Sequence, residues 1–174
     1  MATSVAVLAQ LKAECESTGL TAENSTKIAG ELARMFSVAQ EEVGILKLEK
    51  DSLVFAHPVK LHNVGRIPLN SPAVAVRTAH HRHPELLNAF ARTKHAGFFE
   101  MVDVNSQPGV KKASKDERII QKLMSVPVIA QDRVVGVIQV CRKGATPQAA
   151  GADFTPADLQ NLVAAAAALA ECFH

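Results

Sequence analysis

The sequence predicts an α+β fold in which an antiparallel sheet carries helices from both ends of the chain on one of its faces. Three observations predict it: helical spacing of apolar residues up to residue 36, two hairpin patterns further along, and a return to helical spacing after residue 155. The chain has 174 residues, of which 48% are hydrophobic and 21% charged. A chain of that size can form a core without a metal or a disulfide. We therefore expect a central sheet of about five or six strands.

Two helices are predicted before the first strand. Apolar residues within Ser4–Thr18 recur at steps of three and four, and Gly19 is placed to end that helix. Thr21 has the side chain of an N-cap, and Glu23 in the first turn complements the positive end of a second helix. The apolar stripe of that helix runs to Phe36. The chain therefore begins with two amphipathic helices joined by a glycine turn.

The next segment changes to the period of a strand. Leucines alternate with charged residues and then resume after a turn at 50–52, which predicts a hairpin over residues 42–55. Prolines and glycines punctuate residues 58–72, which we expect to be mostly loop. Pro72 can open a short helix as its first residue, and Pro84 stops that helix.

The middle of the chain is the least regular part of the sequence. The pair Leu86-Leu87 fits a strand or a helix, and residues 90–102 fit a helix or a loop. Lysine and arginine outnumber acidic residues in 103–121, where we expect a basic loop that becomes a short helix near Asp116. Because this loop lacks aromatic residues, a solvated loop is favoured over a surface for nucleic acid or an acidic partner.

The strongest strand signal follows this loop. Residues 124–130 and 134–141 are dense in β-branched side chains and flank a turn at 131–133, which predicts a second hairpin. A loop over 142–153 then leads to a helix that Thr155 caps. Along this helix, apolar residues recur at alternating steps of three and four, the pattern of a heptad seam. They are Leu159, Leu162, Ala166, Leu169 and Phe173.

Composition excludes several classes of protein. A formal net charge of +2, from 19 Lys and Arg against 17 Asp and Glu, lacks the basic bias of a duplex-binding module. No apolar run approaches the roughly 20 residues that cross a bilayer, and the first residues lack the cationic segment of a secretory signal. Three widely spaced cysteines are neither a disulfide framework nor a zinc pattern. We therefore expect a cytoplasmic protein that binds neither nucleic acid nor membrane.

The densest polar segment runs from Arg77 to His83, with His95 further on. Imidazoles at this spacing are typical of a solvated cationic helix end, which we favour over a metal site. A functional use of these groups is anion recognition, with Arg77 or His95 facing a carboxylate or phosphate above the sheet. Three phenylalanines, for which core packing is the alternative, would form its lid. The candidate pocket residues are Arg77, Phe90, His95, Phe98, Phe99 and Glu100.

One family pattern runs through the last third of the sequence. The second hairpin has a strand in which Pro127 precedes hydrophobic residues and a strand in which Gly136 and Gln139 enclose two hydrophobic residues. Phe154 and Asp158 then flank the start of the last helix. This combination resembles the carboxy-terminal half of a GAF domain, and the first hairpin resembles its counterpart there less specifically.

The resemblance implies a division of the chain and a class of function. It predicts an N-terminal amphipathic helix over residues 1–19 and a GAF-like domain over 20–174 that ends in the heptad-patterned helix. It implies a sensory or regulatory module that binds a small molecule and signals by association with a partner. A ligand-free dimerisation or scaffold domain is the alternative. The family's cyclic-nucleotide signature is only partial, because Arg142 and Leu159 replace its Asn and Glu.

A catalytic role is not expected. One branch of the family reduces free methionine sulfoxide with cysteines, and the spacing of Cys15, Cys141 and Cys172 does not match a pattern that carries over. No serine elbow is present either, so no catalytic residue is predicted. Without Trp or Tyr, a pocket would favour a small anionic or apolar ligand over a stacked base, and the sequence names no cofactor.

A homodimer is predicted from the heptad seam. Its residues would pack with the first helix, so the predicted interface combines two elements from the ends of the chain. The interface candidates are Leu8, Leu11, Leu159, Leu162, Ala166, Leu169 and Phe173.

Overall fold

The structure is a computed structural model that describes residues 4–62, 66–90 and 119–174. Six strands form one sheet, and every pairing in it is antiparallel. The α+β prediction and the expected number of strands are confirmed. The strands are β1 (Val43–Glu49), β2 (Ser52–His57), β3 (Arg66–Pro68), β4 (Glu85–Leu87), β5 (Ile119–Ala130) and β6 (Arg133–Gly144). The helices are α1 (Ser4–Thr18), α2 (Ala22–Phe36), α3 (Val74–His81) and α5 (Pro156–Leu169), with short 3-10 turns η1 (Gln40–Glu42), η2 (Val59–Leu61) and η4 (Ala170–Phe173).

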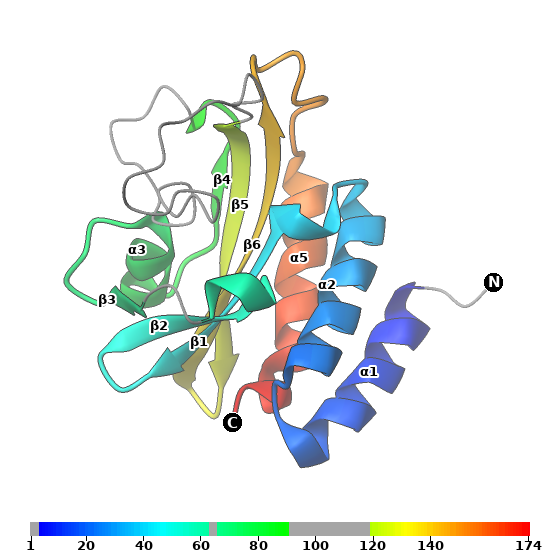
Figure 1. Ribbon diagram of the computed structural model, residues 1–174, viewed down its shortest axis with the longest axis vertical. Helices are drawn as coiled ribbons and strands as arrows, with labels where there is room; N and C mark the ends of the chain where they lie inside the picture. Colours follow the sequence, from blue (N-terminus) through cyan, green and yellow to red (C-terminus); the bar gives the residue numbers. More distant parts are fainter. Residues whose placement is uncertain (1–3, 63–65, 91–118) are drawn as a thin grey trace.

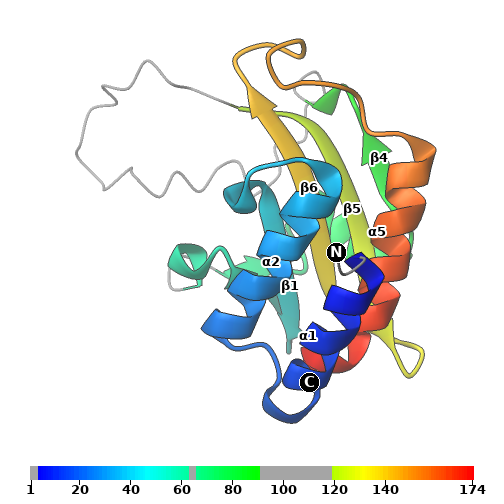
Figure 2. The same cartoon turned by 90° about the vertical axis from the view of Figure 1, so that its right-hand side faces the viewer.

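The sheet separates two layers of different composition. Its strands lie in the order β3-β2-β1-β6-β5-β4, so the two predicted hairpins meet where β1 pairs with β6. Helices α1, α2 and α5 lie on one face, and α3 lies on the other (Figure 1). Figure 2 shows the three helices from their own side, with α1 lying over the lower ends of α2 and α5. We call the first side the helical face and the second the α3 face.

Local sequence signals fix where two of these helices begin. Thr21 and Thr155 both have extended backbones, and each accepts a hydrogen bond from the amide three residues later. In turn, the side-chain oxygens of Asn24 and Asp158 accept a hydrogen bond from the amide of the cap residue, which completes a capping box at both helices. The predicted caps are thus confirmed. A cap of this kind stabilises a helix by about 1 kcal/mol relative to alanine.

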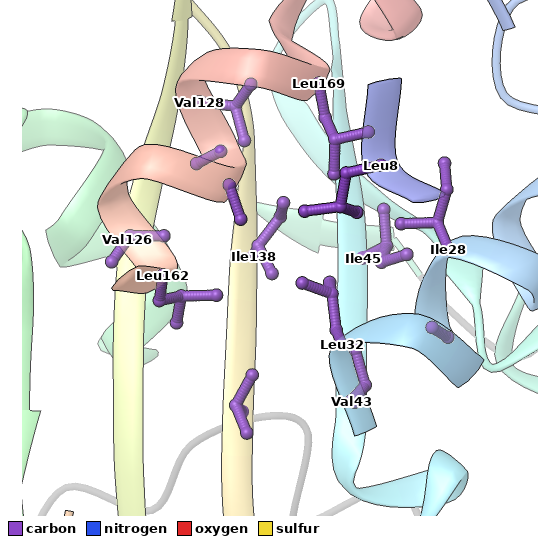
Figure 3. Close-up of a cluster of buried hydrophobic side chains, with 14 of the residues drawn as sticks. Leu8, Ile28, Leu32, Val43, Ile45, Val126, Val128, Ile138, Leu162 and Leu169 are labelled. Carbon is purple, nitrogen blue, oxygen red and sulfur yellow. The ribbon is translucent and has the colours of Figure 1, made fainter. Parts of the chain in front are cut away.

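The helical face is closed by a continuous apolar core. Leu8, Ile28, Leu32, Leu162 and Leu169 come from the three helices and are each at most 5% exposed. Figure 3 shows these side chains directed toward those of the central strands. Burial of each such residue contributes about 1.5–3 kcal/mol. The strand residues labelled there are Val43, Ile45, Val126, Val128 and Ile138.

Gly136 allows the C-terminal turn to pack closely against the first part of β6. A Cβ atom at this position would collide with the carbonyl oxygen of Leu46 on β1 and with the ring of Phe173. The pairing of β5 with β6 also shifts register between Val128 and Ile129, directly opposite. Glycine in this strand therefore marks a close backbone approach beside a bulge, as the sequence pattern suggests.

Several predicted boundaries were wrong. α3 begins at Val74 and not at Pro72, because Ala73 keeps an extended backbone with ψ of 144°. β5 begins at Ile119, within the segment expected to be a loop, because Ile120 is buried on the α3 face. β6 runs past Cys141 to Gly144 and stays paired with β5, with one register shift between Ile120 and Lys122. The expected helix through Phe173 tightens to a 3-10 turn after Leu169.

Two ambiguous regions have different outcomes. Leu86-Leu87 is strand: it belongs to β4, which pairs with β5 at the edge of the sheet. The expectations for most of 90–102 and for a short helix near Asp116 lie outside the described residues. Within the described ranges, no helix is long and apolar enough to cross a membrane.

Candidate ligand-binding site

A chain of buried hydrogen bonds crosses the interface between α3 and the sheet. It joins Thr78 of α3, Ser125 of β5 and Gln139 of β6, each at most 3% exposed. The Gln139 carboxamide donates to Ser125 Oγ over 3.1 Å, and the two hydroxyls are 2.7 Å apart. Thr78 Oγ1 donates to the Val74 carbonyl over 2.9 Å, so Ser125 is the donor to Thr78. The bonds therefore run in one direction, from Gln139 to Ser125 to Thr78 to Val74.

The strand register brings this polar cluster together. Ser125 and Gln139 are direct partners across β5 and β6, and both point to the α3 face beside Leu123, Val137 and Cys141. Thr78 meets them from above because α3 packs on these two strands. The surroundings are otherwise apolar, where an unpaired polar group costs about 1–3 kcal/mol. The position of α3 on the sheet is thus set by directional hydrogen bonds as well as by apolar burial.

An ion pair fastens α3 to the edge of the sheet. Arg77 Nε lies 2.8 Å from Glu85 Oε1, and Nη2 lies 2.5 Å from Oε2, so the contact is bidentate. The hydrogen bond with the Glu85 carboxylate raises the pKa of the Arg77 guanidinium, outweighing its partial burial. Glu85 is the register partner of Ser125, which places the pair next to the polar cluster. Part of the guanidinium that we expected to face an anion is therefore already engaged.

Of the other predicted pocket residues, the structure describes only Phe90. Phe90 is 2% exposed and packs in the core of the α3 face, on the same side of the sheet as Arg77. His95, Phe98, Phe99 and Glu100 lie outside the described residues. Thr78, Ser125 and Glu85 were missed. Their one signal in the sequence is that small or charged polar residues interrupt otherwise apolar segments.

The histidines near the end of α3 make contacts of other kinds. His80 Nε2 donates to the Leu69 carbonyl over 2.8 Å, and Arg82 pairs with Asp132 at 2.8 Å on the surface. Among the described residues, no three His, Cys, Asp or Glu side chains gather closely enough to hold a metal ion.

The residues of the predicted dimer interface are used inside the chain. All of them except Leu159 are at most 7% exposed and belong to the core of the helical face. Leu159 is half-buried against the same core. The 3.5-residue spacing that we read as a seam for a second chain is satisfied by the sheet and by α1. These side chains are therefore not on the surface that a partner would meet.

Two thiols face each other where α1 meets the C-terminal turn. Cys15 and Cys172 are fully buried and hydrogen-bond to each other. Burial raises the pKa of both thiols, that of Cys172 to about 12, where the neighbouring Cys15 adds to the effect. Cys141 is buried separately on the α3 face. A protonated, buried thiol is a poor nucleophile.

The loop after β6 is held in place by contacts that the spacing of residues in the sequence did not indicate. Lys122, only 6% exposed in its side chain, lies 2.8 Å from the Asp153 carboxylate and donates to the Gly151 carbonyl. Asn88 bonds both main-chain groups of Phe154, each over 2.9 Å. The loop is therefore held through β5 and through the segment after β4.

Comparison with known proteins agrees with this architecture. The GAF domain from an Acinetobacter phosphoenolpyruvate-protein phosphotransferase superposes with a TM-score of 0.65 at 14% identity, covering 99% of this chain and 94% of the other. A free methionine-R-sulfoxide reductase from Neisseria meningitidis, in complex with its substrate, gives 0.63 at 18% identity, with 98% and 87% covered. The A. aeolicus nlh2 GAF domain in an inactive state gives 0.61 at 13% identity, with 98% and 94% covered. A search of curated proteins finds no match. The family model of the GAF domain matches residues 28–173, and the chain accordingly belongs to the GAF domain family.

Proposed function

We propose that this chain is a regulatory GAF module that binds a small molecule on the α3 face and transmits the occupied state by association with a second chain or another partner. The observation that carries the proposal is the chain of hydrogen bonds from Gln139 through Ser125 to Thr78. It places a polar centre inside an otherwise apolar layer, and ligand pockets commonly combine apolar walls with a few polar groups. The GAF fold commonly serves sensory or regulatory roles, which supports the same class of function.

Arg77 supports a ligand that carries a negative charge. A guanidinium has five N–H donors, and Glu85 accepts from two of them. The others can bind a carboxylate or phosphate while the ion pair with Glu85 holds the group in place. A ligand at this position would contact α3 and β4 together, and α3 would carry the signal of occupancy.

The test is native mass spectrometry of the purified protein, alone and with a panel of small carboxylates and phosphates. We expect a retained adduct that is weakened by Arg77→Ala and by His95→Ala. Arg82→Ala is the matched control, because Arg82 is an exposed arginine at the end of the same helix, paired with Asp132. Binding that is lost equally in the control, or no adduct across the panel, would count against this site.

A ligand-free scaffold is the second candidate, and one observation favours it. The polar cluster is hydrogen-bonded without a ligand, since the Gln139 amide, the Ser125 hydroxyl and the Thr78 hydroxyl each donate a bond within the chain. A clean dimer by light scattering, together with no adduct across the panel, would favour the scaffold. A dimer would need contacts other than the buried seam. The buried, reduced thiols support a cytoplasmic location for either function.

We do not propose a reductase activity from the likeness to methionine-R-sulfoxide reductase. The raised pKa values of Cys15 and Cys172 leave little thiolate at neutral pH. Turnover of free methionine sulfoxide by the purified protein, abolished by Cys141→Ser, would reverse this judgement.

A further inference from the structure

Two cysteines from distant parts of the chain meet inside the helical face. Cys15 lies in the last turn of α1 and Cys172 in η4, and both side chains are fully buried in the same apolar core. Their thiols hydrogen-bond to each other. Two thiols in contact can be oxidised to a disulfide, whereas a single buried thiol has no partner for that bond.

The main chains that carry the two cysteines also lie side by side. The amide of Gly19 donates to the Cys15 carbonyl over 2.7 Å, so the chain turns directly after α1. A Cβ atom at Gly19 would lie 3.4 Å from the main-chain oxygen of His174 and 3.9 Å from that of Cys172. Figure 2 shows the lower end of α1 beside the turn that follows α5. A disulfide requires neighbouring backbones of this kind, because it joins Cα atoms about 4.4–6.8 Å apart.

A bond between these cysteines would connect α1 covalently to the rest of the core. Without it, α1 packs on α2, α5 and η4, and its described buried side chains are Leu8, Leu11 and Cys15. An exposed ion pair between Lys27 and Glu14 adds little to this packing. A helix held mainly by a few apolar contacts at the border of a core can detach locally while the rest stays folded.

The surroundings of the thiols keep them unreactive while α1 is in place. The nearby cations Lys12 and Lys27 are each paired with a carboxylate, that of Glu16 at 3.5 Å and that of Glu14 at 3.4 Å. Burial raises the pKa of both thiols, that of Cys172 to about 12. A thiolate therefore becomes available to an oxidant when α1 moves away and water enters.

We propose that Cys15 and Cys172 form a disulfide when a hydroperoxide oxidises the protein, and that this bond locks α1 onto η4. Cys15 reacts first, because α1 carries it into water on opening. Its thiolate attacks an oxygen of hydrogen peroxide, the O–O bond breaks, and the departing hydroxide takes up the proton that Cys15 released. The products of this step are a sulfenic acid on Cys15 and one water.

The second step takes place after α1 returns to the core. The Cys172 sulfur attacks the Cys15 sulfur, the S–S bond forms, and the S–O bond breaks; hydroxide leaves with the Cys172 proton as a second water. In total the two thiols lose two electrons and two protons, and hydrogen peroxide accepts them to become two waters. Disulfides in cytoplasmic proteins are mostly transient, so we expect a reducing agent to reverse this one.

This redox site is separate from the ligand site proposed on the α3 face. Cys15 and Cys172 belong to the core of the helical face, whereas Cys141 is buried in the core on the other side of the sheet. Oxidation of the pair therefore does not depend on a ligand, and Cys141 provides an internal control.

The test treats the folded full chain with hydrogen peroxide, blocks the remaining thiols in denaturant and maps disulfides by non-reducing peptide mass spectrometry. We expect a linked pair of peptides that contain Cys15 and Cys172, and recovery of both thiols with a reducing agent. Cys141→Ala is the matched control and should form the same bond, while Cys172→Ala should not. Because the linked peptides are observed in the unsubstituted chain, the test does not require Cys172→Ala to fold. A bond to Cys141, a bond between two chains, or oxidation to sulfinic acids without a linked pair overturns the proposal.

Limited proteolysis tests whether the bond locks α1. Trypsin cleaves after Lys12, one turn before Cys15, when α1 has opened. We expect cleavage there to be about tenfold slower, or slower still, in the oxidised chain than in the reduced chain. Cleavage after Lys60, an exposed lysine of η2, is the control and should change less than about twofold. Equal rates at Lys12 in the oxidised and reduced chains would overturn the lock.

Discussion

The helical face and the α3 face of the sheet are stabilised in different ways. Three helices cover the helical face, and its centre is almost entirely apolar, from Leu8 of α1 to Leu169 of α5. One short helix covers the described part of the α3 face, held by the hydrogen-bonded cluster at Ser125 and the ion pair of Arg77 as well as by apolar contacts. Apolar burial has no direction, whereas hydrogen bonds require particular partners.

Under the proposed function, this difference favours the α3 face as the layer that would transmit a signal. Polar bonds inside an apolar layer can be exchanged for bonds to a ligand, and each exchange moves a specific element. On the α3 face that element is α3 itself. The stability of the helical face, by contrast, depends on how well the volumes of its side chains fill the core.

The largest effect is expected at Gly136, beneath the C-terminal turn of the helical face. Gly136→Ala would place a methyl group against the Leu46 carbonyl and the Phe173 ring. Phe173 can move, but the backbone of β1 cannot do so without breaking its pairing. We expect a loss of about 3 kcal/mol or more in the free energy of unfolding, measured by urea denaturation.

Gly30→Ala is the matched control for this prediction. Gly30 lies within α2, and an added methyl group there would meet only Gln40 atoms at 3.8–4.0 Å. Because alanine is the better helix former, this change should stabilise the protein by about 0.5–1 kcal/mol. A loss below about 1 kcal/mol for Gly136→Ala would show that the helical face adapts more readily than its packing indicates.

A smaller effect is expected on the α3 face. Ser125→Ala removes the acceptor of the Gln139 amide and the donor to Thr78, leaving buried groups without partners. We expect a loss of about 1–3 kcal/mol, against less than about 0.5 kcal/mol for Ser17→Ala at an exposed site of α1. Adding Thr78→Val and Gln139→Leu should recover part of the loss, since the orphaned groups are removed too. Strict additivity of the three changes would contradict the cluster.

The smallest effect is a dependence of stability on alkaline pH at the thiol pair of the helical face. The pKa of Cys172 rises from 9.0 in an ordinary thiol to about 12 in the folded chain because of burial. The unfolded chain therefore loses this proton first as the pH rises, and stability falls once the pH exceeds 9. Between about pH 8 and pH 10 we expect a loss of about 1 kcal/mol from this group.

Urea denaturation across this pH range measures the effect. The wild-type slope should flatten in Cys172→Ala, while the absolute stability of that variant is lower through lost packing. An unchanged slope in the variant would assign the alkaline loss to other groups. Labelling of Cys172 by a thiol reagent should likewise be slow in the folded chain and fast in urea.

Periodicity and capping were readable from the sequence where the deciding contacts are local. Thr21 and Thr155 begin their helices as expected because an N-cap bonds within three residues of itself. The second hairpin was correct in its turn but too short at its outer ends. Pairing between β5 and β6 extends both strands through charged residues such as Lys122 and Arg142, which no local preference for strand would predict.

The candidate site was predictable only in part, because its contacts join residues that are distant in the sequence. Arg77 and Phe90 were identified by residue type, and both lie on the α3 face, but the engagement of Arg77 by Glu85 depends on where β4 joins the sheet. The heptad pattern of α5 was read correctly as an apolar stripe and assigned to another chain. Spacing shows that a face is covered, but it does not show by what.

The sequence by itself determined the α+β class, the helix caps, the two hairpins and the family resemblance, because each depends on short-range spacing or on residues adjacent in the chain. Only the tertiary structure decided which residues meet across long separations: Ser125 with Thr78, Cys15 with Cys172, and Lys47 with His174. Those contacts depend on strand register and on which helix covers which face. A pattern repeated along one segment carries no information about its distant partner.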